Sequence, residues 1–158
     1  MRNGQNNTGA QRQFVIFRLQ DTDFAVPIEQ VWRIVPLTDS TRVPHTPEFI
    51  KGVINLHGSI VPVVDLKKRF GLADTPYGEE ARIIVVEEGG QQVGMTVDGV
   101  TEIAWLPEEN IEPPPALIAD INGVFLTGVA THNDRVFIIL DLSRVLSPEE
   151  TNALENAT

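Results

Sequence analysis

Short apolar runs separated by polar turns recur along the chain and predict a mostly β protein. Four pairs of runs flank a polar or glycine-containing turn, which is typical of a β-hairpin. The expected hairpins cover residues 14–26, 53–64, 83–97 and 124–140. Helix signals are few. Asp65 is suited to cap a short helix over residues 66–70 that Gly71 would end, and residues 147–150 (SPEE) predict the start of a short C-terminal helix.

The same order of elements occurs twice along the chain. The aligned ranges are 14–35 with 83–104, at a shift of 69, and 52–70 with 128–146, at a shift of 76. Apolar positions of two strands often match by chance when the strands are aligned. The matches that identify the repeat are therefore Gly52 with Gly128, Asp65 with Asp141, and the turns. Each half therefore reads as hairpin, connector, hairpin and Asp-capped turn.

This repeat predicts two small barrels packed along a common apolar seam. A unit of about 60 residues buries little surface alone, and closure into a barrel removes free strand edges. We expect one domain over residues 13–146, with halves of about 13–72 and 82–146 that are able to swap strands. Residues 1–12 are expected to be a disordered N-terminus, and residues 147–158 a C-terminal helix and tail.

Composition excludes several classes of protein. The net charge of −10 argues against nucleic-acid binding, and the one basic cluster, residues 67–69, reads as a solvated helix face. The longest apolar run, residues 136–140, is far shorter than the roughly 18 residues that span a bilayer. The polar start of the chain does not resemble a signal peptide, and cysteine is absent. These features are most compatible with the cytoplasm.

Candidate enzyme chemistry is sparse. The sequence has no phosphate loop, dinucleotide-binding glycine pattern, zinc-protease motif or nucleophile elbow. His45, His57 and His132 each stand beside turn residues without a second histidine at ligand spacing. Asp65 and Asp141 occupy equivalent repeat positions, and helix capping explains both better than acid–base catalysis. We therefore expect no catalytic residue, metal site or cofactor.

The remaining candidate is an apolar stretch, residues 28–35 (IEQVWRIV). As a strand it would expose either Trp32 and Ile34 or Val31 and Val35, and a helix would also leave part of it uncovered. Two interpretations stay open: the stretch forms the core between the barrels, or it lines a docking groove at their seam.

Residues 52–66 (GVINLHGSIVPVVDL) resemble the CheW coupling proteins of bacterial chemotaxis. Supporting stretches follow the family's order and spacing at residues 46–51, 94–100, 125–128 and 139–142. The resemblance implies an all-β fold with short helices, in which two SH3-like five-stranded barrels share a hydrophobic core. It also implies a non-enzymatic cytoplasmic adaptor, recruited to membrane receptor arrays without inserting into the membrane. Such an adaptor joins the cytoplasmic tips of chemoreceptors to the regulatory domain of the histidine kinase CheA.

In proteins of this family a helical hairpin of the receptor lies in the groove between the barrels. The resemblance places the receptor-binding groove at Val31, Trp32, Ile34, His57, Val97, Gly99 and Val100. The sequence departs from the family at two of the nearby positions, with His57 where arginine is usual and Arg33 where glutamate is frequent. A mostly neutral histidine lacks the fixed charge of a guanidinium, and Arg33 reverses a charge. We therefore expect altered specificity for receptor or kinase.

Two alternatives to this function differ in class. One is an adaptor of a non-flagellar chemosensory array, for example one that controls pilus motility. The other is a small hydrolase built on the same barrels, which the lack of catalytic motifs disfavours.

Overall fold

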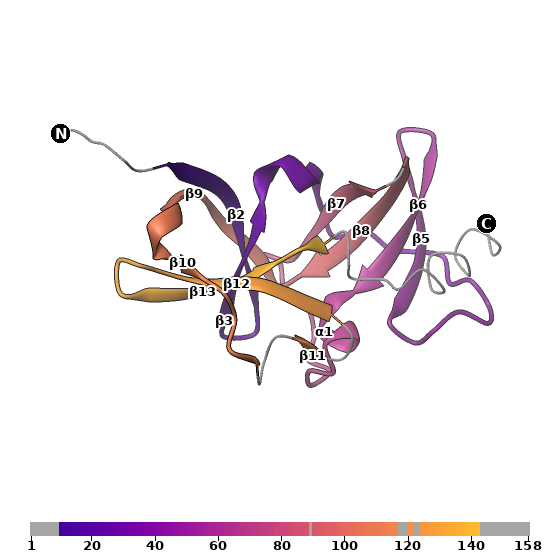
Figure 1. The fold of residues 1–158 in the computed structure, drawn as a ribbon. Helices are drawn as coiled ribbons and strands as arrows, with labels where there is room; N and C mark the ends of the chain where they lie inside the picture. Colours follow the sequence, from indigo (N-terminus) through magenta and orange to yellow (C-terminus); the bar gives the residue numbers. More distant parts are fainter. Residues whose placement is uncertain (1–9, 89, 117–119, 122–123, 143–158) are drawn as a thin grey trace.

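Two β-sheets form the structure, a computed structural model that describes residues 10–88, 90–116, 120–121 and 124–142 (Figure 1). Within these residues the first sheet has seven strands and the second has five. In order, the first contains β10 (Ile111–Glu112), β12 (Val124–His132), β13 (Arg135–Leu140), β3 (Thr22–Pro27), β2 (Gln11–Leu19) and β9 (Gly99–Pro107), with β11 (Asp120–Ile121) beside β12. The second contains β4 (Val31–Pro36), β7 (Arg82–Glu88), β8 (Gln91–Val97), β6 (Ser59–Asp65) and β5 (Ile50–Leu56). The short helices are η1 (Ile28–Gln30), α1 (Leu66–Arg69) and η2 (Glu108–Asn110).

The four predicted hairpins are confirmed as the antiparallel pairs β2–β3, β5–β6, β7–β8 and β12–β13. Two of them have two-residue turns at equivalent repeat positions. The φ angles are 52° and 87° at His57 and Gly58, and 52° and 62° at Asn133 and Asp134. Positive φ at both central residues gives a turn whose twist matches the flanking strands, and Gly, Asn and Asp adopt it most easily.

The chain crosses between the sheets twice within the described residues. Strands β2 and β3 lie in the first sheet, β4 to β8 lie in the second, and β9 returns to the first. Figure 1 shows the result: the indigo hairpin β2–β3 lies with the yellow-orange strands β12 and β13, which are far away in the sequence. Each sheet thus combines the first hairpin of one sequence repeat with the later strands of the other.

Strand register follows the sequence repeat. The parallel pairing between β13 and β3 places Ile139 opposite Ala25, and the one between β6 and β8 places Val63 opposite Gly94. The shifts of 76 and 69 residues convert one of these pairs into the other. The two sheets are therefore built on the same plan.

Three buried clusters fill the molecule. The first sheet encloses Phe14, Ile16, Ala25, Leu106, Ala130, Phe137 and Ile139. The second encloses Ile54, Val61, Val63, Ile83 and Val85. A larger cluster between the sheets, here called the seam core, contains Val15, Phe17, Leu19, Phe24, Val26, Ile50, Val64, Leu66, Phe70, Ile84, Val86, Val93, Met95, Val97, Leu126, Leu140 and Leu142. Because side chains alternate along a strand, one face of β2 packs inside its own barrel and the other packs on the seam. The predicted fold, two small barrels around a shared core, is confirmed.

Helix α1 follows the predicted pattern. The Asp65 carboxylate accepts a hydrogen bond from the backbone N–H of Lys68 at 3.2 Å, and Gly71 after the helix has a φ of 72°. In the other repeat, Asp141 accepts a hydrogen bond from the side-chain amide of Gln30. A helix that Asp141 could cap, and the expected helix from residue 147, lie outside the described residues.

The N-terminal boundary differs from the prediction. Strand β2 begins at Gln11, so the expectation of disorder up to residue 12 is wrong at its last two positions. Gln11 and Arg12 pair with Pro107 and Leu106 at the end of β9. Backbone pairing with a long neighbouring strand keeps these polar residues in β2. Their side chains alone do not predict a strand.

Gly52 occupies a position that excludes other residues. Its φ is +149°, and an added Cβ atom would overlap the carbonyl oxygen of Thr41. The segment at Thr41 forms an isolated antiparallel bridge to Val53, so backbone runs directly over the glycine. The close approach explains why a glycine marks the repeat here.

Candidate protein-interaction site

The apolar stretch at residues 28–35 folds as η1 followed by strand β4. Burial alternates along β4, with Trp32 47% exposed and Ile34 37% exposed, whereas Val31 and Val35 are half-buried. Of the predicted alternatives, the strand that exposes Trp32 and Ile34 is therefore correct. Strand β4 stands at one end of its sheet and pairs with β7 among the described strands. Two large apolar side chains thus lie on an edge strand, where a partner has access.

The cation next to Trp32 belongs to the same surface. The Arg33 guanidinium lies 4.8 Å from the centre of the Trp32 ring, within the range of a cation–π contact. This contact restrains the indole and places a positive charge beside it. The edge of β4 is therefore both apolar and locally basic, on a chain with a net charge of −10.

The predicted groove residues at the crossing from β8 to β9 are less accessible. Val97 is fully buried in the seam core, and Gly99 is buried as well. Val100 is half-buried and packs against the seam core, as Val31 does. The expectation that Val97 and Gly99 face a partner is therefore wrong for this structure, because Val97 packs in the seam core and Gly99 lies against Arg18 and Glu80. An added Cβ atom at Gly99 would lie 3.1 Å from the Arg18 guanidinium.

His57 lies apart from β4 in the strand order. It occupies the exposed turn of the β5–β6 hairpin, with β5 at the opposite end of the sheet from β4. The carboxamide oxygen of Asn55 accepts a hydrogen bond from the N–H of Gly58 at 3.0 Å and holds this turn. His57 is thus presented to solvent at a hairpin tip.

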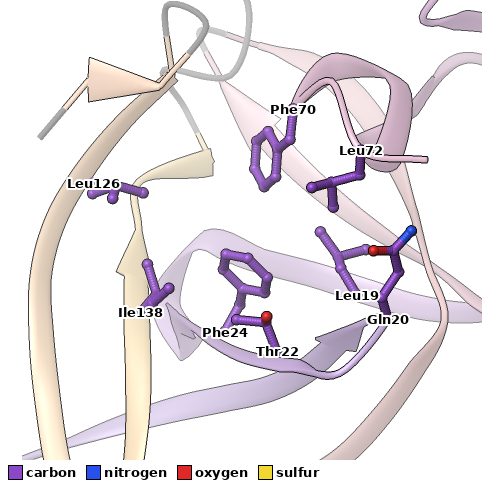
Figure 2. Close-up of a pocket in the computed structure, with 8 residues that line it drawn as sticks. All are labelled: Leu19, Gln20, Thr22, Phe24, Phe70, Leu72, Leu126 and Ile138. Atoms are coloured by element: carbon purple, nitrogen blue, oxygen red, sulfur yellow. The ribbon is translucent and has the colours of Figure 1, made fainter. Parts of the chain in front are cut away.

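An apolar pocket opens at the seam at residues that the sequence did not single out (Figure 2). Its volume is about 160 Å³, and its lining comprises Leu19, Gln20, Thr22, Phe24, Phe70, Leu72, Leu126 and Ile138. Figure 2 shows Leu126 and Ile138 on one side, Leu19 and Leu72 on the other, and the two phenylalanine rings between them. A cavity of this size holds one aromatic ring or one branched aliphatic side chain.

A buried ion pair contacts the pocket residue Gln20, whose N–H donates to the Asp98 carboxylate at 2.7 Å. The Lys67 ammonium donates to the Asp98 carboxylate at 3.0 Å, and to the carbonyl and hydroxyl oxygens of Thr75 at 2.8 and 2.9 Å. The exposed fractions of the Lys67 and Asp98 side chains are 1% and 11%. The expectation that the whole basic cluster at residues 67–69 is solvated is therefore wrong for Lys67, because acceptors from two other segments enclose its ammonium.

Tyr77 extends this network. Its ring lies 3.9 Å from the Lys67 ammonium, and its hydroxyl donates to the Asp65 carboxylate at 2.7 Å. A further hydrogen bond of 2.9 Å joins the hydroxyl to that of Thr96. Burial raises the pKa of the Tyr77 phenol; the bond to Thr96 opposes the rise, and the negative charge of Asp65 adds to it.

The described part of the chain shows neither a metal centre nor a membrane span. It has no group of three or more His, Cys, Asp or Glu side chains placed to hold a metal ion. It also has no helix with the length and apolar character needed to cross a bilayer.

Comparison with known proteins identifies the family. The model of the CheW-like domain matches residues 13–150. The chain belongs to the CheW-like family. It is 36% identical to the chemotaxis protein CheW of Klebsiella aerogenes over 145 residues, which cover 92% of this chain and 87% of that protein. It is 30% identical to the protein FrzA of Myxococcus xanthus, over 91% of both chains.

A solved CheW structure supports the same assignment. The crystal structure of the scaffolding protein TtCheW from Thermoanaerobacter tengcongensis matches with a TM-score of 0.82 and 38% identity. The match covers 89% of this chain and 96% of TtCheW. The predicted family and fold are thus confirmed, and the chain is a non-enzymatic CheW-like chemotaxis coupling protein.

Proposed function

We propose that this CheW-like chain is a cytoplasmic adaptor that binds the cytoplasmic tip of a chemoreceptor and the regulatory domain of the histidine kinase CheA. Recruitment to membrane receptor arrays follows from the receptor contact and needs no cofactor. The observation that carries the receptor contact is the exposure of Trp32 and Ile34 on edge strand β4. An amphipathic helix of the receptor would place its apolar face on these side chains.

The half-buried residues extend this surface toward the seam. Val31 and Val100 hold equivalent positions in the two repeats, and both pack on the seam core from its rim. Val97 and Gly99 are buried and therefore offer no surface to a partner. We therefore assign direct receptor contact to Val31, Trp32, Ile34 and Val100.

Arg33 and His57 set specificity in this proposal. Arg33 offers a positive charge beside the exposed Trp32 ring and favours a receptor with a carboxylate at the matching position. His57 presents an imidazole, which lacks the multiple donors of a guanidinium, at a separate hairpin tip. Arg33→Glu and His57→Arg restore the residues frequent in the family. Both variants should shift preference toward a typical receptor tip, and unchanged affinities would refute the specificity assignment.

Titration calorimetry with a soluble receptor tip tests the contact. Trp32→Ala should weaken binding by roughly 30-fold, as for the central aromatic residue of an interface. Trp105→Ala is the matched control, because Trp105 is 56% exposed on β9 at the edge of the other sheet. It should change the affinity less than twofold. Equal effects of the two variants, or no effect of either, would contradict the assignment of β4.

Val31→Asp provides a second test. The charge would lie at the rim of the seam core and repel an apolar helix face, so receptor binding should fall while the circular dichroism spectrum stays unchanged. Loss of the folded spectrum would mean that Val31 is a core residue, and Val31 would leave the proposed contact.

A second candidate is an adaptor of a chemosensory array with a non-flagellar output, such as pilus motility. The similarity to FrzA of Myxococcus xanthus is consistent with this second function. Deletion of the gene, followed by swimming and surface-motility assays, separates the two outputs. A defect in swimming alone supports the flagellar system, and a defect in surface movement alone supports the alternative.

A further inference from the structure

Different polar interactions stabilise the two crossings between the sheets. At the first crossing, η1 joins β3 to β4, and the Gln30 amide donates to Asp141 at 2.9 Å and accepts from the N–H of Leu142 at 3.0 Å. At the second crossing, one residue, Asp98, joins β8 to β9. Both crossings contact the segment that follows the last strand of a repeat, near Leu142 or near Lys67. The neutral amide of Gln30 stabilises the first crossing, and the buried ion pair between Lys67 and Asp98 stabilises the second.

The Asp98 carboxylate contacts both barrels. One oxygen accepts from Lys67, which follows strand β6 of the second sheet, at 3.0 Å. The other accepts from the backbone N–H of Gln20, in the β2–β3 turn of the first sheet, at 2.7 Å. The N–H of Asp98 also donates to the carbonyl oxygen of Arg18 at 3.0 Å. The polar groups at this crossing therefore tie one barrel to the other.

The same residues border the interaction surface. Gln20 lines the seam pocket, and its side-chain amide donates to the carbonyl oxygen of Ala73 at 3.0 Å. Val97 and Gly99 flank Asp98 along the chain. A change in the angle between the barrels at Asp98 would therefore deform the pocket and the adjoining rim at Val100.

We propose that Asp98 is a positioning residue that fixes the angle between the two barrels and so keeps the receptor-binding surface in one shape. Lys67 is the counter-charge that this role requires. A buried ion pair adds little net stability relative to an apolar pair, and its best-supported use is to specify one arrangement among several. The role of Asp98 in fixing the angle between the barrels is inferred from the structure alone. The effect of that angle on receptor binding rests on the proposed function.

Spin-label distances between the barrels test the angle directly. Because the chain has no cysteine, Ser59→Cys on the second sheet and Thr131→Cys on the first introduce the only two label sites. Double electron–electron resonance should give one narrow distance distribution in the parent protein. Asp98→Asn should broaden that distribution or split it. Asp21→Asn removes an exposed carboxylate beside Gln20 and is the matched control, which should leave the distribution unchanged.

Binding measurements separate positioning from general destabilisation. In Asp98→Asn, affinity for the receptor tip should fall at least fivefold at a temperature where the circular dichroism spectrum is still native. If Asp98→Asn does not fold, Lys67→Met/Asp98→Asn, which has no unpaired buried charge, replaces it in both measurements. An unchanged distance distribution in a folded variant overturns the proposal, as does failure of both variants to fold. Failure of the parent protein to bind a receptor tip overturns the proposed function, while the distance measurement still decides the role of Asp98.

Discussion

Removal of the Lys67 ammonium should destabilise the fold far more than removal of a surface charge. Lys67→Met keeps most of the unbranched apolar stem, but the Asp98 carboxylate stays buried without its counter-charge. Thr75 also loses the donor to its carbonyl and hydroxyl oxygens. An unpaired buried charge costs about 3–5 kcal/mol. That is a large part of the roughly 5–15 kcal/mol that stabilises a typical domain.

Urea denaturation followed by circular dichroism measures this loss. For a chain of this length, about 3–5 kcal/mol corresponds to a fall in Tm of roughly 6–20 °C. Lys68→Met is the matched control, because Lys68 is the exposed neighbour on the same short helix, and it should change stability by less than about 0.5 kcal/mol. The double variant Lys67→Met/Asp98→Asn should recover part of the loss. A loss below about 1 kcal/mol in Lys67→Met would refute the ion pair as a buried, weakly screened contact.

Two further predictions concern backbone fit and pH. Gly52→Ala should cost roughly 1–3 kcal/mol more than Gly58→Ala in urea denaturation, because both have positive φ but only the first overlaps backbone at Thr41; equal losses would contradict the overlap. Tyr77, the only tyrosine, has a raised pKa when folded, so its proton is lost first from the unfolded chain. The contribution of Tyr77 to the free energy of unfolding is therefore fully present below pH ~10. Above that pH, the free energy of unfolding should fall by about 1.4 kcal/mol per pH unit because of this group. Ultraviolet titration should detect phenolate only as the protein unfolds, and phenolate in the folded protein near pH 10 would refute its burial.

Local patterns in the sequence predicted the hairpins because turn chemistry and apolar alternation act over a few residues. The pair His57–Gly58 between two apolar runs predicted a turn that the φ angles of 52° and 87° now describe. Alternation along β4 left two possible exposed faces, since a strand pattern tells which residues share a face but not which face is covered. The choice of Trp32 and Ile34 depends on the neighbouring strand β7 and on the seam core beneath.

Long-range contacts explain the errors at the other candidate positions. Val97 looked like a groove residue, but the crossing at Asp98 folds it into the seam core. Lys67 looked solvated, because no local signal reports that Asp98, 31 residues later, and Tyr77 would enclose its ammonium. The seam pocket joins Leu19 to Leu126, and only the exchange of hairpins between sheets brings such distant residues together.

An adaptor of the proposed kind binds receptor and kinase at the same time. Analytical ultracentrifugation of the protein mixed with a receptor tip and with the regulatory domain of a CheA kinase tests it most directly. We expect a ternary species that Trp32→Ala reduces to the complex of adaptor and kinase domain alone. Two mutually exclusive binary complexes, or a ternary species that Trp32→Ala leaves intact, would contradict it.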